Sequence, residues 1–282
     1  MKKSISTWSF PSAWSLKEQF SLAREAGFSG FEVALDENGP ISLRSSRKEL
    51  LAVRRLADRR GLVLSGLATG LYWGANAASK ELSTRNRAAE ILRCQIKAAS
   101  ILGIDAVLVV PGAVGVDFIP GCETVPYEVV HQRATAFLRA ALPEAERRGV
   151  TLAIENVWNK FLLSPLEMRA FLDQFDSERI ASYFDVGNAL ATGYPEHWIG
   201  ILGNRIARVH FKDYRRAVGS ADGFCDLLSG NVDWPAVTRA LRTIPYSGWI
   251  AAEMIPPVPF YKHHPEVLIH NTSRAMDAIL EC

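Results

Sequence analysis

The sequence predicts an α/β protein with a (β/α)8 barrel, and the regular alternation of strand and helix patterns is the main reason. Short apolar, β-branched runs recur eight times, and each is followed by a segment with helical periodicity and a charged face. The run Ala106-Val107-Leu108-Val109-Val110 is apolar without alternation, which fits a strand buried on both faces of a parallel sheet. Eight such pairs without a low-complexity break favour one closed barrel domain over residues 1–282.

The expected elements follow one another in strict order along the chain. The strands are expected at residues 4–9, 30–34, 62–68, 106–110, 151–154, 181–185, 206–211 and 248–253. The helices are expected at residues 16–26, 47–60, 83–102, 126–148, 165–174, 196–202, 235–243 and 265–280. A doubly wound sheet is the alternative fold, but no G-x-G-x-x-G follows the first strand to support a dinucleotide site.

Several element boundaries carry their own chemical signal. Gly103 and Gly149 each follow a helical run and precede a strand, where a left-handed residue commonly ends a helix. Ser164-Pro165 followed by Glu167 is typical of a capped helix start, because the serine hydroxyl accepts a free backbone N–H. These signals place the helix ends where the alternation requires them.

Composition disfavours several classes of protein. Lys plus Arg total 32 and Asp plus Glu total 30, so a formal charge of +2 indicates no nucleic-acid or anionic-membrane partner. The longest uncharged apolar stretch, residues 106–116, is too short to cross a bilayer. Met1-Lys2-Lys3 is typical of a signal-peptide start, but Pro11 and several serines interrupt any apolar segment behind it. Four widely spaced cysteines fit reduced thiols, so we expect a cytoplasmic protein.

Each of the last four expected strands finishes with one ionisable residue behind an apolar run. These residues are Glu155, Asp185, His210 and Glu253. The C-terminal strand ends form the reactive face of a (β/α)8 barrel, so the four side chains should converge on one axial pocket. Three carboxylates and one imidazole would repel and desolvate each other there unless a cation lay between them. We therefore expect one divalent metal ion, Mn²⁺ first, with Mg²⁺, Co²⁺ or Zn²⁺ as alternatives.

The motifs around these residues resemble the xylose isomerase-like TIM-barrel sugar isomerases and epimerases. They read Glu155-Asn156-Val157-Trp158-Asn159, Asp185-Val186-Gly187-Asn188, His210-Phe211-Lys212-Asp213 and Glu253. The resemblance covers essentially the whole chain and is closer to the ketose 3-epimerase and L-ribulose- or L-xylulose-5-phosphate 3-epimerase-like branch. It implies a metal-dependent isomerase that removes a proton next to a metal-bound ketose carbonyl through an enediolate. It also implies that Glu155 and Glu253 are both metal ligands and proton carriers.

The resemblance also implies substrate contacts beside the metal. Arg216 stands six residues after His210, where ketose epimerases carry a substrate-binding arginine. Asn188 stands three residues after Asp185, where several relatives have histidine instead. A second carboxylate of the ketose epimerases is replaced here in the stretch that contains Lys160. These departures leave the identity of the sugar open.

The remaining expected substrate-binding residues are aromatic or basic. Trp158 and Phe10 lie at or beyond strand ends, and they are expected to wall the pocket against the apolar face of a sugar. Lys212 is expected at the pocket mouth, where a sugar phosphate would need positive charge. The basic residues of this rim are Lys160, Lys212, Arg215, Arg216 and Lys262.

Other reactions stay open on the same barrel. An inosose-type dehydratase or a hydroxypyruvate-type isomerase would use the same four ligands. A barrel that binds sugars without turnover is disfavoured because both candidate proton carriers are present. An apurinic endonuclease would need further histidines after strands 2 to 4, where this chain offers Glu32, Thr69 and Pro111. The expected partner is a small-molecule sugar or sugar phosphate, and the resemblance alone implies a homodimer or homotetramer.

Overall fold

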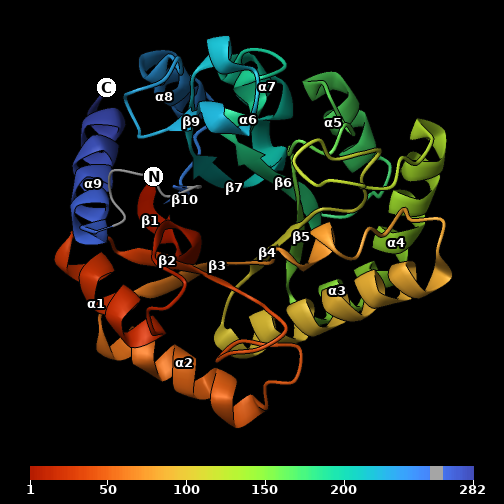
Figure 1. Cartoon of the computed structure of the whole chain (residues 1–282), viewed down its shortest axis with the longest axis horizontal. Coiled ribbons are helices and arrows are strands. Elements are labelled where there is room, and N and C mark those ends of the chain that lie inside the picture. The colour runs from red at the N-terminus through yellow and green to blue at the C-terminus, as the bar shows by residue number, and fades with distance from the viewer. Residues whose placement is uncertain (255–262) are drawn as a thin grey trace.

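Eight parallel strands close into a barrel in the computed structural model, which describes residues 1–254 and 263–282 (Figure 1). Around the barrel the strand order is β1-β10-β7-β6-β5-β4-β3-β2. The barrel closes at β1, because Ser4 is in register with Gly30 of β2 and with Ala251 of β10. The barrel strands are β1 (Lys2–Ser6), β2 (Gly30–Ala34), β3 (Val63–Ala68), β4 (Ala106–Val109), β5 (Thr151–Glu155), β6 (Ile180–Asp185), β7 (Ile206–Phe211) and β10 (Trp249–Ala252).

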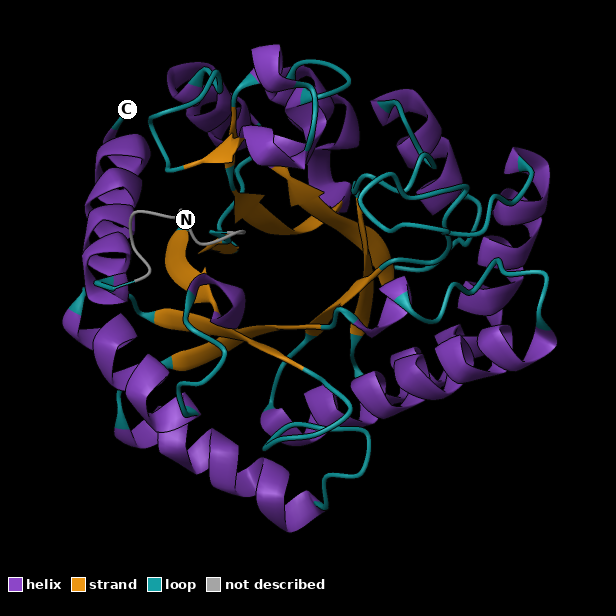
Figure 2. Ribbon diagram, viewed as in Figure 1, coloured by secondary structure: helices purple, strands orange, loops and turns teal. Residues whose placement is uncertain are grey.

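Helices form an outer layer around the strands (Figure 2). The α-helices are α1 (Leu16–Glu25), α2 (Arg47–Arg59), α3 (Leu82–Leu102), α4 (Tyr127–Arg148), α5 (Pro165–Asp173), α6 (Val186–Leu190), α7 (Pro195–Leu202), α8 (Trp234–Thr243) and α9 (Pro265–Glu281). Short 3-10 turns are η1 (Thr7–Ser9), η2 (Leu71–Trp73), η3 (Gly203–Arg205), η4 (Arg216–Val218) and η5 (Ala221–Gly223). The predicted barrel class is confirmed.

The local signals behave as expected at the helix ends. The Ser164 hydroxyl accepts the Glu167 N–H and begins α5, with Pro165 in its first turn. Gly103 and Gly149 follow α3 and α4 with φ of 80° and 66°, the left-handed conformation that ends a helix. All four residues of β4 are buried, which explains why that run does not alternate.

The first and last strands differ from the sequence expectation. The strand expected at residues 4–9 already ends at Ser6, because the Ser6 hydroxyl accepts the Trp8 N–H and turns the chain into η1. The expectation for this strand end is therefore wrong by three residues. The last strand stops at Ala252, so Glu253 lies just beyond it.

Two small features of the barrel top are absent from the sequence expectation. A two-stranded antiparallel sheet, β8 (Asp213–Tyr214) with β9 (Phe224–Cys225), lies in the segment after β7. The helix α6 directly follows β6, and its Gly187 packs so closely that a Cβ there would lie 2.7 Å from the Lys212 carbonyl oxygen. The small sheet joins two segments across a loop, and α6 begins at a cap formed by Asp185, a residue that the sequence pattern indicates only as a ligand.

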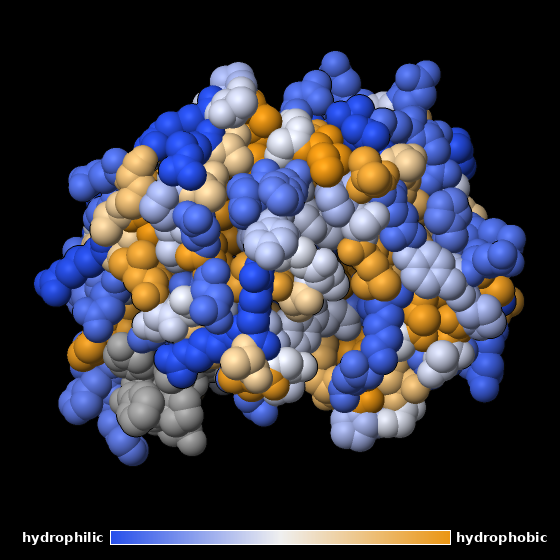
Figure 3. All heavy atoms as spheres, turned by 90° about the horizontal axis from the view of Figure 1, so that it is seen from above, coloured by the Kyte–Doolittle hydropathy of each residue, from blue (hydrophilic) through white to orange (hydrophobic). Residues whose placement is uncertain are grey.

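The surface seen from above mixes hydrophilic residues with smaller hydrophobic groups (Figure 3). Among the described residues, none of the helices combines the length and the apolar character that crossing a bilayer requires.

Candidate active site

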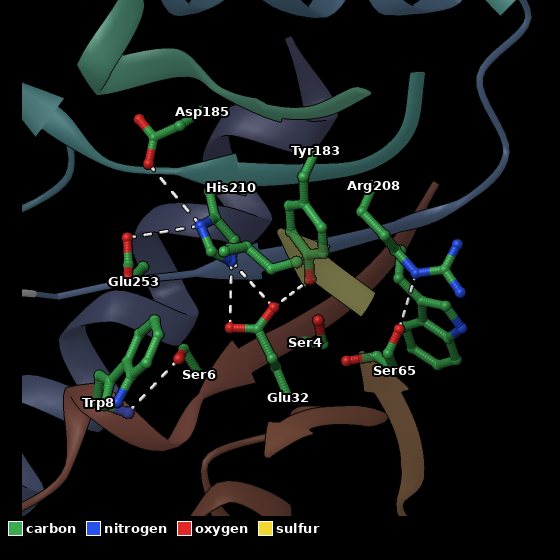
Figure 4. A network of polar contacts seen from close by, with 12 residues as sticks. Ser4, Ser6, Trp8, Glu32, Ser65, Tyr183, Asp185, Arg208, His210 and Glu253 are labelled. Carbon is green, nitrogen blue, oxygen red and sulfur yellow. Dashed lines mark hydrogen bonds and ion pairs between the residues drawn. The ribbon is translucent and has the colours of Figure 1, made fainter. Parts of the chain in front are cut away.

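The ends of β5, β6 and β7 and the residue after β10 bring the four expected ligands together (Figure 4 draws three of them). One ligand atom from each of Glu155, Asp185, His210 and Glu253 lies within 4.8 Å of all the others. His210 Nδ1 is 3.4 Å from Glu253 Oε2, 3.7 Å from Glu155 Oε1 and 3.8 Å from Asp185 Oδ2. All four side chains are buried, with at most 7% of any residue exposed. The strand-end pattern thus predicts a real spatial cluster.

The donor atoms of this cluster fit a divalent cation. His210 Nδ1 is buried and makes no hydrogen bond, and Asp185 Oδ2 also makes none, although the Lys212 ammonium lies 3.3 Å from it. Buried polar atoms nearly always have a partner, so the unpaired imidazole nitrogen facing three carboxylates indicates a place for a cation. Carboxylate oxygens with one imidazole nitrogen are a donor set that Mn²⁺, Mg²⁺, Co²⁺ and Zn²⁺ all accept.

Hydrogen bonds at the ends of β5 and β6 fix Asp185. The Asn156 side chain accepts the Asp185 N–H at 2.8 Å and donates to the Asp185 carbonyl oxygen at 2.8 Å. Asp185 Oδ1 accepts the Asn188 N–H at 2.6 Å and so caps α6. Only Oδ2 is left to face the cluster, which fixes how this carboxylate can bind a cation.

Lys212 lies among the ligands. Its ammonium group pairs with Glu253, is 3.3 Å from Asp185 Oδ2, and lies 4.8 Å from the centre of the Phe224 ring. Burial alone would raise the pKa of Glu253, but the positive charges of Lys212 and His210 lower it to about 2. Lys212 therefore acts as an internal counter-ion for the carboxylates as well as a residue that faces the cavity.

The other two carboxylates and the imidazole respond differently to burial. Burial raises the pKa of Glu155 to about 7, and it also raises the pKa of Asp185 although Lys212 opposes that shift. Burial alone would lower the pKa of His210, but the carboxylates of Glu32 and Glu253 raise it well above its usual value. Without a cation, Glu155, Asp185 and His210 therefore hold protons at a higher pH than free side chains do, whereas Glu253 does not.

A cavity of about 480 Å³ opens over the cluster, large enough for a small sugar-like molecule. Glu155, Glu253 and Lys212 line it together with Asn188. The remaining wall is mostly apolar and includes the aromatic residues Trp8, Trp73, Phe118, Trp158 and Phe224. A flat apolar wall opposite charged groups suits a molecule with one apolar face and several hydroxyls.

Trp158 and Asn188 connect this cavity to a neighbouring one. The Trp158 indole N–H donates to the Asn188 carbonyl oxygen at 3.4 Å, and the Asn188 side chain donates to Glu155 Oε1 at 3.4 Å. Both residues line the cavity over the cluster and also a second cavity of about 470 Å³. Asn188, like Lys212, is thus an expected substrate residue that contacts a candidate ligand directly.

Two of the expected substrate residues, Arg216 and Phe10, lie apart from the cluster. Arg216 lines the second cavity, where it donates to the carbonyl oxygen of Gly193 at 2.9 Å and stacks over Tyr194. Phe10 is 3% exposed, packs against Phe31 and lines a cavity elsewhere.

The described part of the chain shows no contact between the ligands and two other basic residues of the expected rim. Lys160 pairs with Asp117 at 2.5 Å, and Lys262 lies outside the described residues. The substrate-binding roles of Arg216 and Phe10 stay predictions, as do those of Lys212, Trp158 and Asn188.

Glu32 of β2 is a site residue that the strand-end pattern does not reveal. It is fully buried, and its oxygens lie 2.9 and 3.1 Å from His210 Nε2 (Figure 4). It also accepts a hydrogen bond from the Tyr183 hydroxyl. The signal in the sequence is a single charge inside the otherwise apolar strand of residues 30–34. Glu32 precedes the end of this strand by two residues, so the sequence alone favours interpreting it as an ordinary exposed residue.

Comparison with solved structures shows the same fold in proteins of low sequence identity. The structure of D-psicose 3-epimerase with D-tagatose from Clostridium cellulolyticum H10 has a TM-score of 0.81, 17% identity, and full coverage of both chains. The zinc-binding structure of the IOLI protein has a TM-score of 0.81 and 15% identity, covering 100% of this chain and 98% of that one.

Sequence comparison adds a relative and a family. The Haemophilus influenzae protein named "Putative L-ribulose-5-phosphate 3-epimerase SgbU" is 25% identical over 250 residues, 84% of this chain and 83% of that protein. The sequence profile described as "Xylose isomerase-like TIM barrel" matches residues 20–271, which is most of the chain. With the closed barrel and its buried ligand cluster, this match shows that the chain belongs to the xylose isomerase-like TIM barrel family.

Proposed function

We propose that this protein is a divalent-metal-dependent epimerase or isomerase of a sugar or sugar phosphate, and that it moves a proton next to a ketose carbonyl. The observation that carries the proposal is that Glu155 and Glu253 belong to the ligand cluster and also line the cavity above it. The epimerases named among the similar proteins support the same class of reaction.

The four clustered residues would hold the cation, which we expect to be Mn²⁺, with Mg²⁺, Co²⁺ or Zn²⁺ as alternatives. When bound, a divalent cation supplies Lewis-acid polarisation of a ketose carbonyl and makes the neighbouring C–H more acidic. The zinc atom named in the structure of the similar IOLI protein supports a divalent cation in a barrel of this fold.

The two glutamates approach the cavity from different sides. Along the barrel, β7 and β6 separate β10, which precedes Glu253, from β5, which ends in Glu155. A sugar between them meets one carboxylate on each side, so one glutamate removes a proton and the other returns one. Proton return to the opposite face of the same carbon inverts a stereocentre, whereas return to the neighbouring carbon interconverts aldose and ketose.

The surrounding residues orient the substrate and the bases. The Asn188 amide holds Glu155, and the Lys212 ammonium holds Glu253. The aromatic wall excludes water from the reacting carbon and covers the apolar face of the sugar ring.

The test is proton exchange in D₂O followed by NMR, with Mn²⁺ added and a panel of free and phosphorylated ketoses. We expect deuterium uptake at one carbon beside the carbonyl, and loss of that uptake when a chelator is added. Uptake at C3 indicates a 3-epimerase, and uptake at C1 indicates an aldose–ketose isomerase. Products that have lost a hydroxyl would instead indicate a dehydratase on the same ligands. A protein that binds Mn²⁺ but exchanges no proton in any sugar would contradict the proposal.

A further inference from the structure

We propose that Glu32 is a positioning residue for His210: it holds the imidazole by Nε2 and thereby presents Nδ1 to the cation. This inference rests on the proposed metal site, and it assigns a role to a residue outside the four ligands. Glu32 lies on β2 and His210 on β7, with β1 and β10 between them around the barrel, so the contact crosses the barrel interior.

The geometry of the ring separates its two nitrogens. Nε2 lies 2.9 and 3.1 Å from the two oxygens of Glu32, whereas Nδ1 faces Glu155, Asp185 and Glu253 at 3.4 to 3.8 Å. Figure 4 shows His210 between Glu32 on one side and Asp185 and Glu253 on the other. The ring therefore bridges two acidic groups with different tasks.

The hydrogen-bond chemistry of a carboxylate fixes the tautomer. Carboxylate oxygens only accept, so Nε2 must carry the proton that it donates to Glu32. A neutral imidazole with its proton on Nε2 has a bare lone pair on Nδ1, and that lone pair is what a cation needs. Carboxylates that accept the second N–H of a ligating histidine commonly orient the ring and strengthen binding.

Tyr183 and Gly66 show that Glu32 is held in place from its other side. Tyr183 donates its hydroxyl to Glu32 Oε2, and its ring packs edge-on against His210 with centroids 4.7 Å apart. A Cβ on Gly66 of β3 would lie 2.6 Å from the Tyr183 hydroxyl and 3.3 Å from Glu32 Oε2. A glycine inside a strand is typical of such a close approach, so the barrel leaves space for this pair.

A purely structural role for Glu32 makes different predictions. If Glu32 only linked β2 to the strands across the barrel, then losing its bond to Tyr183 or its bond to His210 would have similar consequences. If Glu32 positions His210, losing the bond to His210 weakens cation binding more than losing the bond to Tyr183 does. Glu32→Gln and Tyr183→Phe separate the two cases, because glutamine keeps one acceptor oxygen for two donors and Tyr183→Phe leaves the His210 bond in place.

The first experiment is competitive titration of Zn²⁺ against a fluorescent chelator, with wild type and both variants. We expect Glu32→Gln to weaken Zn²⁺ binding about 10- to 100-fold, the usual effect of losing an outer partner of a ligating histidine. Tyr183→Phe keeps the Glu32–His210 contact, so it should weaken Zn²⁺ binding clearly less than Glu32→Gln does, and its thermal stability reports any packing loss. Equal weakening in both variants, or none in Glu32→Gln, would overturn the proposal.

The second experiment is ¹⁵N and ¹H NMR of the His210 ring in the Zn²⁺-loaded protein, which a merely structural role would not affect. Wild type should show Zn²⁺ on Nδ1 and a slowly exchanging, low-field proton on Nε2. This proton should exchange faster in Glu32→Gln than in Tyr183→Phe, which keeps the Glu32–His210 contact. Zn²⁺ bound through Nε2 in wild type would overturn the proposal even if Glu32→Gln did not fold. Wild type that binds no Zn²⁺, Mn²⁺ or Mg²⁺ would count against the proposed metal site instead.

Discussion

Two halves of the barrel end very differently. The strands β5, β6 and β7 and the residue after β10 contribute Glu155, Asp185, His210 and Glu253, whereas β1 to β4 end in uncharged residues. The half formed by β1 to β4, whose strand ends are uncharged, contributes cavity wall instead, with Trp8 after β1 and Trp73 after β3. Trp158 and Phe224 of the ligand half complete that wall. The candidate reacting groups are therefore concentrated on one half, whereas both halves shape the space where a substrate would lie.

Glu32 is the exception that connects the halves. It is a buried carboxylate within the half whose strand ends are uncharged, and it contacts His210 and Tyr183 of the ligand half. Substitutions in the ligand half should therefore abolish proton transfer or cation binding. Substitutions in the other half should change substrate affinity, except at Glu32, where we expect a change in cation binding.

The largest expected effect is the loss of proton transfer when either proton carrier of the ligand half is neutralised. Glu155→Gln and Glu253→Gln should each slow deuterium exchange by at least about 10²- to 10⁴-fold, because an amide cannot accept the proton. Circular dichroism should show an intact fold, and the exposed Glu90, paired with Arg87, gives the matched control Glu90→Gln. Near-normal exchange in either site variant would contradict the two-base assignment.

The next effect concerns cation binding by the same half. His210→Ala removes the nitrogen donor that faces the three carboxylates, so Zn²⁺ affinity should fall by more than the about 10- to 100-fold expected of an outer partner. Isothermal titration with Zn²⁺ measures this loss. Unchanged cation content after dialysis would remove His210 from the ligand set.

A smaller effect is the pH dependence of cation binding. Without a cation, burial raises the pKa of Glu155 to about 7, and neighbouring carboxylates raise that of His210 despite its burial. A cation must displace these protons, so its affinity should increase with pH from 5 to 8 and decrease on acidification. Titrations at fixed ionic strength test this, and an affinity independent of pH over that range would contradict it.

The smallest effect is expected in the uncharged half. Trp73→Ala removes one aromatic wall of the cavity, and an aromatic contact of about 0.5–1.5 kcal/mol corresponds to a rise in KM of roughly 2- to 10-fold. Zn²⁺ affinity should not change. Trp14 lines a different cavity and provides the control Trp14→Ala. Equal effects of both variants on KM would contradict a role of Trp73 in binding the substrate.

The barrel and its ligand cluster follow from the sequence because both depend on regular patterns. Strand and helix periods set the element order, and every parallel strand end lies on the same face. Glu155, Asp185, His210 and Glu253 therefore come together without knowledge of any long-range contact.

Most of the remaining features depend on contacts between distant segments, which no local pattern contains. Glu32 meets His210 only after the barrel has closed, and Arg216 donates to the carbonyl oxygens of Leu190, the last residue of α6, and of Gly193. The helix α6 exists because Asp185 caps it, so a residue read as a ligand also shapes the backbone. Such double roles are visible only in three dimensions.

Lys212 has a consequence for how the protein behaves when metal is scarce. Its ammonium group already neutralises part of the charge on Glu253 and Asp185, so the carboxylates have a counter-ion even without a metal. The barrel strands are held by their own backbone pairing and packed core, not by the ligands. We therefore expect the chain to keep its fold without the cation, and to take up and release metal reversibly while Lys212 remains in the site.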